Sequence, residues 1–415
     1  MIWVWSGNPT LTGAFTEAHK WSMQVLGRVA LTTYQGMLKA LLSWGKTLLP
    51  LIGKQFHSLM NKHGGRHWRV GRWMALAVDG SRISVPRTAE NEKAFCAPNY
   101  GKSSTAKYRR KKRQGKPRRL KHKKKMQPVK PQIWMTLLWH MGLHMPWSWK
   151  TGPSYSCERD HFRAMLKEEK FPENTLFCAD AGFTGYDLWK AMIDSGHSFL
   201  IRVGSNVKLL RNLGYVQEHQ GIVYLWPASA VDKEQPPLVL RLLKLQVGRC
   251  TMWLVSNVLE EKHLSDQDAT RLYKLRWGVE LQFCTIKQTF GRRKLKRRTP
   301  ENALVELDMA MLGLWLIQLF AVKEQIEIGK VPEQCSVSIA IQVVREMIQR
   351  WSETPEESFV QTLQGATKDT YKRISSKKAR YRPDYKDKPS AGKPKILKAT
   401  RELKAKVKKL LSNAA

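Results

Sequence analysis

The chain has 415 residues, of which 72 are Lys or Arg and 34 are Asp or Glu, so its formal net charge is +38. So much positive charge on a chain that is 42% hydrophobic indicates a folded protein that binds a polyanion, most often nucleic acid. A ribosome-like scaffold and a merely solvated surface are the alternatives. The scattered cysteines form no CxxC pair, which argues against a zinc finger and a disulfide framework. The N-terminus lacks signal-peptide features, and the longest apolar run (309–322) is too short to cross a bilayer, so we expect a cytoplasmic protein with no membrane partner.

The first 70 residues are expected to be helical. Apolar residues recur at helical spacing through 10–62, and Pro50 is predicted to break the helix. Residues 63–72 are expected to form a basic linker to the next part of the chain.

Strand-like and helix-like segments then alternate as far as residue 206. The expected strands are 73–80, 131–142, 146–152, 175–183 and 197–206, and the expected helices are 157–169 and 186–196. Strands first, followed by a β-α-β-α-β order, indicate an α/β sheet with helices packed on it.

Residues 207–258 differ in character, because three strand-like stretches are separated by turn residues, and we expect a small all-β unit there. Beyond it, residues 264–290 are expected to form one long helix that ends at Gly291. Residues 300–320 should form a second long helix with a proline at its start.

Two segments consist largely of basic residues. Between Lys107 and Lys125, 13 of 19 residues are Lys or Arg, and the tail 366–415 has 17 Lys or Arg against four acids. Such segments bind phosphate backbones electrostatically without reading the base sequence. The first is expected to be a loop (99–130) between two strands, with a nuclear targeting run as the alternative. Its predicted DNA contacts are Arg109, Arg110, Lys111, Lys112 and Arg113.

Three carboxylates are candidates for chemistry. Asp79 follows apolar residues of a predicted buried strand, where an acid is costly unless it binds a cation or a donor network. Asp180 ends another predicted strand and would face Asp79 if the two strands are neighbours. For both, a turn or cap aspartate is the alternative interpretation. Glu280 lies on the predicted helix 264–290, where a surface salt bridge is the alternative.

Four residues of this helix have the spacing Y-x2-R-x3-E-x6-K, namely Tyr273, Arg276, Glu280 and Lys287. At 3.6 residues per turn they fall within an arc of roughly 60°. One helix face would thus carry an acid, two cations and a phenol. This combination suits a carboxylate that binds a metal ion while its neighbours hold phosphates.

Two aspartates from strands and a glutamate from a helix can bind two divalent ions. Hard oxygen ligands select Mg²⁺ or Mn²⁺ over zinc. Two ions roughly 4 Å apart can activate a water or a 3′-hydroxyl and stabilise the leaving oxygen of a phosphodiester. We therefore predict two Mg²⁺ ions in the site, with Mn²⁺ as a substitute.

These residues resemble the signature of the DDE transposases of the insertion-sequence IS-four family. The Y-x2-R-x3-E-x6-K match is complete, VDGSRISVPRT (78–88) resembles the family's first-aspartate block, and ADAGFTGYDLWK (179–190) resembles its second. The resemblance covers about residues 70–320. It implies an α/β protein with an RNase H-like mixed-sheet core and a β-rich insertion between the second aspartate and the glutamate.

The resemblance also implies a division of the chain. The expected parts are an N-terminal helical, DNA-binding domain (1–70), the first part of the catalytic core (71–206), the insertion (207–258), the second part of the core (259–325) and a basic C-terminal region with DNA or dimer contacts (326–415).

Roles for single residues follow from the same resemblance. The implied metal ligands are Asp79, Asp180 and Glu280, and the implied phosphate contacts are Tyr273, Arg276 and Lys287. Trp253 lies where members of the family stack a tryptophan on a flipped base of a DNA hairpin, with a core tryptophan as the alternative. Arg292 and Arg293, just after the helix, are further predicted DNA contacts.

The predicted function is cut-and-paste DNA transposition by a Mg²⁺-dependent DNA endonuclease and strand transferase. Its partners would be double-stranded DNA, as terminal inverted repeats and target DNA, and a second copy of the chain, because both ends must be joined at once. A bacterial cytoplasm and association with the nucleoid are expected. The alternatives are a domesticated or inactive DNA-binding protein derived from a transposase, and another RNase H-like nuclease.

Overall fold

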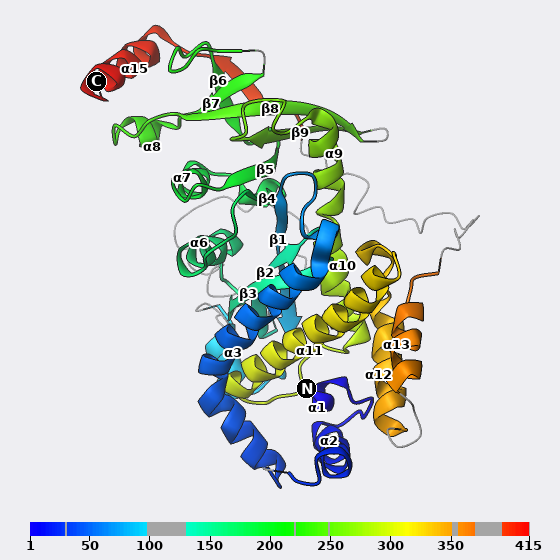
Figure 1. Cartoon of the computed structure of the whole chain (residues 1–415). Coiled ribbons are helices and arrows are strands. Elements are labelled where there is room, and N and C mark those ends of the chain that lie inside the picture. The colour runs from blue at the N-terminus through cyan, green and yellow to red at the C-terminus, as the bar shows by residue number, and fades with distance from the viewer. Residues whose placement is uncertain are drawn as a thin grey trace, which may run out of the picture.

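A computed structural model describes residues 1–29, 31–97, 130–219, 221–247, 250–350, 356–369 and 392–414. The described strands form one mixed ten-stranded sheet in the order β10-β6-β7-β8-β9-β5-β4-β1-β2-β3 (Figure 1). The strands are β1 (Met74–Ser84), β2 (Gln132–His140), β3 (Met145–Pro153), β4 (Thr175–Ala179), β5 (Ser198–Val203), β6 (Lys208–Arg211), β7 (Ile222–Leu225), β8 (Leu238–Val247), β9 (Cys250–Ser256) and β10 (Lys395–Lys398).

One half of this sheet has the strand arrangement expected of an RNase H-like core. β1 is antiparallel to β2 and β2 to β3, whereas β4 runs parallel to both β1 and β5. Residues 74–78 of the central β1 are all buried, because helices cover both faces of the sheet. The predicted α/β fold class is confirmed, as are the five strands predicted before residue 207. The predicted strand 175–183 is shorter than expected, since β4 ends at Ala179.

The strands of residues 207–258 extend the same sheet. β9 pairs antiparallel with β5, and β8, β7 and β6 follow outward. Leu254 and Val255 are both buried, so β9 is covered on both faces like a core strand. The predicted strands are confirmed, but they do not stand apart as a separate all-β unit. Their outer edge is covered by β10, which pairs parallel with β6 and comes from the basic C-terminal tail.

Helices lie on both faces of the sheet. α6 (Glu158–Glu168) and α7 (Tyr186–Asp194) pack on one face, and α3 (Tyr34–Gly64) and α11 (Pro300–Glu327) pack on the other (Figure 1). Among the described helices α11 alone is long and apolar enough to cross a membrane, but 78% of its apolar window is buried, so it is a core helix. The other helices here are α1 (Ile2–Trp5), α2 (Leu11–Leu26), α4 (Ala89–Phe95), α8 (Ala228–Val231), α12 (Val337–Gln349), α13 (Glu356–Gly365) and α15 (Arg401–Ala414).

The helical N-terminal region is confirmed, but the predicted break at Pro50 is wrong, because α3 runs through it. Pro50 is exposed, so its ring stays out of the core and the helix loses a single backbone hydrogen bond there. Packing holds the second half of the helix, where the Phe56 ring lies 5.1 Å from the Trp315 ring of α11. The predicted linker at 63–72 accordingly begins inside α3.

The single helix predicted over 264–290 is interrupted. α9 (Asp266–Leu275) and α10 (Gly278–Cys284) are separated by a turn at Arg276 and Trp277, and the last turn is a π-helix (Thr285–Thr289). A Cβ atom on Gly278 would lie 2.0 Å from the Trp139 ring of β2. The break therefore occurs where the backbone comes too close to the sheet for any side chain, a tertiary contact that helical periodicity does not reveal.

Candidate active site

Two neighbouring strands bring the first two predicted acids together. β1 and β4 are parallel, and Ala77 pairs with Cys178. Asp79 lies two residues beyond Ala77, and Asp180 lies two residues beyond Cys178, so the two aspartates are at the same edge of the sheet. Asp180 ends its strand and caps a short 3-10 turn, where its Oδ1 accepts a hydrogen bond from the Gly182 amide at 2.8 Å.

Asp79 is half-buried and lies within electrostatic range of the other predicted acids. Burial raises the pKa of its carboxyl to about 6, opposed by the hydrogen bond that Oδ1 accepts from the Gly80 amide at 2.8 Å. Asp180 and Glu280 raise the pKa of Asp79 further, and Arg276 lowers it. All three predicted acids thus form one group of like charges, named the acidic pocket, beside the middle of β1 and just beyond the end of β4.

Glu280 reaches this acidic pocket from α10 and is paired with Arg276. The Nη2 atom of Arg276 lies 3.4 Å from Oε1 of Glu280, one helical turn away. Such an ion pair was the alternative to metal binding. Arg276 is only 3% exposed and its charge acts on Asp79, whereas the Glu280 side chain is 45% exposed, so the pair has one buried and one solvent-facing member.

Lys287 and Tyr273 complete the predicted group of four. The Nζ atom of Lys287 donates a hydrogen bond to Oγ of Ser81 at 2.6 Å, close to Asp79 on β1, and burial lowers the pKa of its ammonium group. Tyr273 is 1% exposed, and burial raises the pKa of its phenol to about 12. Its ring lies 5.3 Å from the Arg276 guanidinium. Lys287 thus stands at the pocket, whereas Tyr273 lies beneath it.

A fourth acid, Glu158 in the first turn of α6, also faces the acidic pocket, and sequence reasoning missed it. Burial, followed by the charges of Asp180 and Asp79, raises the pKa of Glu158 to about 7. Its only sequence signal is that of an acid at the start of a predicted helix, which is common because it interacts favourably with the helix dipole.

The oxygen atoms of these acids are the donors that Mg²⁺ and Mn²⁺ prefer, so the residues present fit such ions in kind. In the described part of the chain, no three His, Cys, Asp or Glu side chains are already arranged to hold one metal ion. The Glu280 side chain is turned toward Arg276. For the three acids to share one metal site, it would have to rotate away from Arg276.

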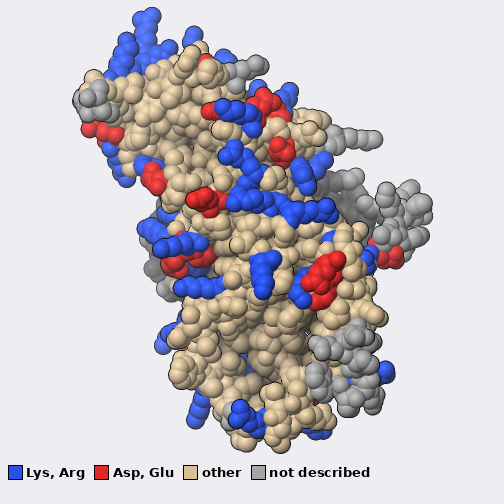
Figure 2. All heavy atoms as spheres, viewed as in Figure 1, with Lys and Arg blue, Asp and Glu red and all other residues tan. Residues whose placement is uncertain are grey.

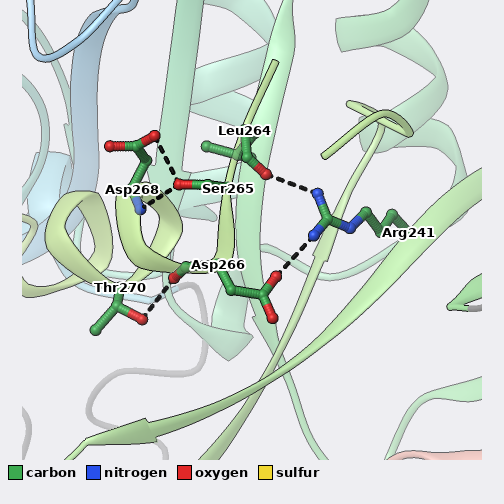
Figure 3. A network of polar contacts seen from close by, with 6 residues as sticks. All are labelled: Arg241, Leu264, Ser265, Asp266, Asp268 and Thr270. Atoms are coloured by element: carbon green, nitrogen blue, oxygen red, sulfur yellow. Dashed lines mark hydrogen bonds and ion pairs between the residues drawn. The ribbon is translucent and has the colours of Figure 1, made fainter. Parts of the chain in front are cut away.

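A network of polar contacts fixes the start of α9 (Figure 3). Arg241 of β8 donates to the Leu264 carbonyl at 2.6 Å and pairs with Asp266 at 2.7 Å. Ser265 caps the helix by accepting from the Asp268 amide at 3.0 Å, and its hydroxyl donates to the Asp268 carboxylate at 2.7 Å. These contacts join β8, one of the strands that extend the core sheet, to α9, the helix that carries Tyr273 into the core.

The loop after the π-helix is organised by a buried acid, Glu306 of α11. Its carboxylate accepts hydrogen bonds from the backbone amides of Lys296 and Arg297 and lies 3.5 Å from Nε of Arg292. Arg292, a predicted DNA contact, is therefore buried, and burial lowers the pKa of its guanidinium. The exposed cations of this loop are Arg293, Lys294, Lys296 and Arg298.

Trp253 lies in β9 and is half-buried. Its ring lies 5.3 Å from Nζ of Lys393 and 5.9 Å from Nζ of Lys244, so cations flank the exposed part. This setting differs from that of a fully buried core tryptophan. The predicted contacts of the basic loop, Arg109, Arg110, Lys111, Lys112 and Arg113, lie outside the described residues.

A groove of about 830 Å³ runs along α9 and α10, and Glu280, Lys274 and the half-exposed Trp277 contribute to its lining. Asp79 and Asp180 do not line it, so the groove adjoins the acidic pocket without containing it. Figure 2 shows Lys and Arg side chains along the whole length of one face, with acidic side chains in smaller patches between them. This distribution fits an extended polyanion better than a compact one.

Comparison with known proteins identifies a matching family, a curated relative and a more distant solved structure. The profile of a family described as "Transposase DDE domain" matches residues 74–316. The chain is 24% identical over 304 residues to the transposase InsG for insertion sequence element IS4 of Escherichia coli (strain K12), which covers 70% of this chain and 60% of that protein. A cryo-EM structure of a piggyBac transposase synaptic complex with hairpin DNA aligns with a TM-score of 0.38 at 12% identity, over 73% of this chain and 59% of the other.

Proposed function

Because the chain belongs to the family of transposases that share the DDE domain, we propose that it cleaves DNA at the ends of a mobile element and joins those ends to target DNA. The observation that carries this proposal is the meeting of Asp79, Asp180 and Glu280 beside two cations, Arg276 and Lys287. The chain spans 60% of the length of the curated relative, so the proposal rests on the site itself.

In the proposed mechanism Asp79, Asp180 and Glu280 hold two Mg²⁺ or Mn²⁺ ions. When bound, such ions make a nucleophile from water or a 3′-hydroxyl and stabilise the leaving oxygen. Lys287 is held by Ser81 at the edge of the acidic pocket, where its ammonium group can bind a phosphate of the cleaved end. Arg276 is buried, so its proposed role is to offset the charges of Glu280 and Asp79 from within the chain.

The buried predicted contacts take supporting roles in this proposal. Tyr273 holds the Arg276 guanidinium from below, at 5.3 Å from its ring, and does not itself touch DNA. Arg292 anchors its loop on Glu306, so that the exposed Arg293 can contact the backbone.

Trp253 is proposed to stack on an unpaired base beside the cleaved end, with Lys244 and Lys393 binding adjacent phosphates. Trp253→Ala should then slow formation of a hairpin more than the first nick, because stacking on one base supplies about 1–3 kcal/mol. Time courses of both products on one labelled substrate measure this. Equal slowing of the two steps would instead indicate a core role.

The proposed partners are double-stranded DNA, as terminal inverted repeats and target, and a second copy of the chain in the DNA complex. Residues 1–70 are proposed to read the terminal repeats. The basic loop (99–130) and the basic C-terminal region (326–415) are proposed to add backbone or dimer contacts. The proposed setting is the bacterial cytoplasm, on the nucleoid.

The alternatives remain a domesticated or inactive DNA-binding protein and another RNase H-like nuclease. A cleavage assay on the element's own ends with Mg²⁺ tests all three. We expect wild type to nick both ends and Glu280→Ala to bind the ends without nicking them. Binding without nicking by the wild type would support the inactive protein, and nicking without preference for the ends would support the other nuclease.

A further inference from the structure

Two glycines make room for the Glu158 carboxylate beside the two aspartates. A Cβ atom on Gly80 would lie 2.6 Å from Oε2 of Glu158, and a Cβ atom on Gly182 would lie 2.9 Å from Oε1. Both distances are too short for a real side chain. The carboxylate therefore occupies space that is open only because the residues next to Asp79 and near Asp180 have no side chain.

The position of Glu158 relative to Asp180 follows from the same geometry. Oδ1 of Asp180 also lies 2.9 Å from the place of a Cβ on Gly182. Two oxygen atoms at this distance from one point can be separated by no more than twice that distance. A single divalent ion bound at about 2 Å by two oxygen atoms needs them to be no more than about 4 Å apart, a separation that this limit permits. Glu158 thus lies within reach of an ion held by Asp180.

The dipole of α6 does not by itself account for this placement. The first turn of α6 has a second acid, Asp160, which is exposed and pairs with Arg163 at 3.6 Å. Asp160 can interact with the helix dipole from solvent. Glu158 instead lies beside Asp180 and within electrostatic range of Asp79. The charge of the neighbouring Arg159 opposes theirs only in part, and its guanidinium donates a hydrogen bond to the Thr184 carbonyl and not to Glu158. Like charges at this proximity repel each other, and a cation between them removes the repulsion.

We propose that Glu158 is a fourth carboxylate ligand of the divalent ions, alongside Asp79, Asp180 and Glu280. This proposal rests on the proposed function, because it assigns one more ligand to the same site. The site then has one acid from within β1, one from just beyond the end of β4 and one from each of two helices on opposite faces of the sheet. Glu158 approaches from the α6 side, and Glu280 approaches from the α10 side.

The test is Mn²⁺ binding by the purified full-length protein, followed by electron paramagnetic resonance of the free ion. Glu158→Gln should weaken binding of at least one Mn²⁺ by about tenfold or more, as expected for loss of a group that contacts or orients a bound metal. Asp160→Asn, on the same helix turn, should bind as the wild type does. Asp79→Asn, which alters a ligand of the proposed function, should also weaken binding.

Thermal unfolding keeps the test independent of activity and of folding defects. Without added metal, the unfolding midpoint of Glu158→Gln should equal or exceed that of the wild type, because one repelling charge is gone. The rise in midpoint on addition of Mn²⁺ should be smaller than for the wild type, since a ligand stabilises the folded state according to its affinity.

The outcomes separate this proposal from the function on which it rests. Unchanged Mn²⁺ binding by Glu158→Gln together with weakened binding by Asp79→Asn would overturn the role of Glu158 and leave the proposed function standing. Unchanged binding by both variants, or a wild type that binds no Mn²⁺, would overturn both.

Discussion

Two helix starts in this molecule carry acidic side chains and use them in opposite ways. At the start of α9, Asp266 is paired with Arg241 at 2.7 Å, and Asp268 is hydrogen-bonded to Ser265 (Figure 3). At the start of α6, Glu158 faces two other acids. An acid that stabilises the fold has its partner within the chain. An acid that faces other acids is better explained by a bound ligand that offsets their charges.

Replacing one acid of the acidic pocket should have the largest effect on DNA cleavage. It should also distinguish the pocket most clearly from the start of α9. We expect Asp79→Asn to lower Mg²⁺-dependent nicking by about a thousandfold or more, because several kcal/mol of charge stabilisation are lost. Binding to the ends, measured by gel shift, should persist. The matched exchange Asp266→Asn should leave nicking close to the wild-type rate, and the reverse pattern would contradict the comparison.

Among the acids discussed that have a partner within the chain, the buried Glu306 should contribute most to the free energy of unfolding. Glu306→Ala removes the acceptor of two loop amides and the partner of Arg292, and should lower the free energy of unfolding by about 3–5 kcal/mol. Urea denaturation measures this. Glu301→Ala, an exposed acid in the first turn of the same helix, is the control and should change stability little. Equal losses for both variants would mean that the buried contacts contribute nothing.

Arg241 of β8 joins the strands that extend the core sheet to α9, and its loss should have an intermediate effect on stability. Arg241→Ala should lower the free energy of unfolding by about 1–2 kcal/mol, less than a fully buried pair, because Asp266 is largely exposed. Nicking should slow modestly as α9 becomes less well fixed. Lys262→Ala, which alters an exposed ion pair, is the control. Nicking that falls to background would indicate that Arg241 acts directly on DNA.

The smallest effect is expected at the cap of α9. Ser265→Ala removes the hydroxyl that accepts from the Asp268 amide and should cost about 1 kcal/mol of stability. Thermal or urea unfolding is sensitive enough to detect it. A loss of nicking without a loss of stability would contradict the comparison, because it would mean that Ser265 takes part in DNA cleavage and does not only cap the helix.

The core strands, and the neighbouring places of Asp79 and Asp180 on two of them, could be predicted from the sequence for a physical reason, whereas the role of the three acids stays a prediction. Strands such as β1 consist of apolar residues buried on both faces, and an aspartate that ends such a run is conspicuous. The interruption between α9 and α10 was not predictable, because it depends on the approach of Gly278 to Trp139 from another strand.

Two further features were hidden for related reasons. Glu158 is one acid among several at helix starts, and only the folded chain places it between Gly80 and Gly182. β10 is a four-residue strand within a basic tail, and its identity depends on the free edge of β6, which lies far away in the sequence. Local patterns carry burial and periodicity, but they carry no information on which distant residues meet.

The pairing of β10 with β6 has a consequence for biosynthesis. The ribosome completes β6 well before β10, and at about 5–20 residues per second many seconds separate the two. During that interval the backbone of β6 is an unpaired strand edge that a neighbouring nascent chain can occupy. Closure of the sheet therefore waits for the last part of the chain, and the tail determines when a newly made molecule ceases to be prone to aggregation.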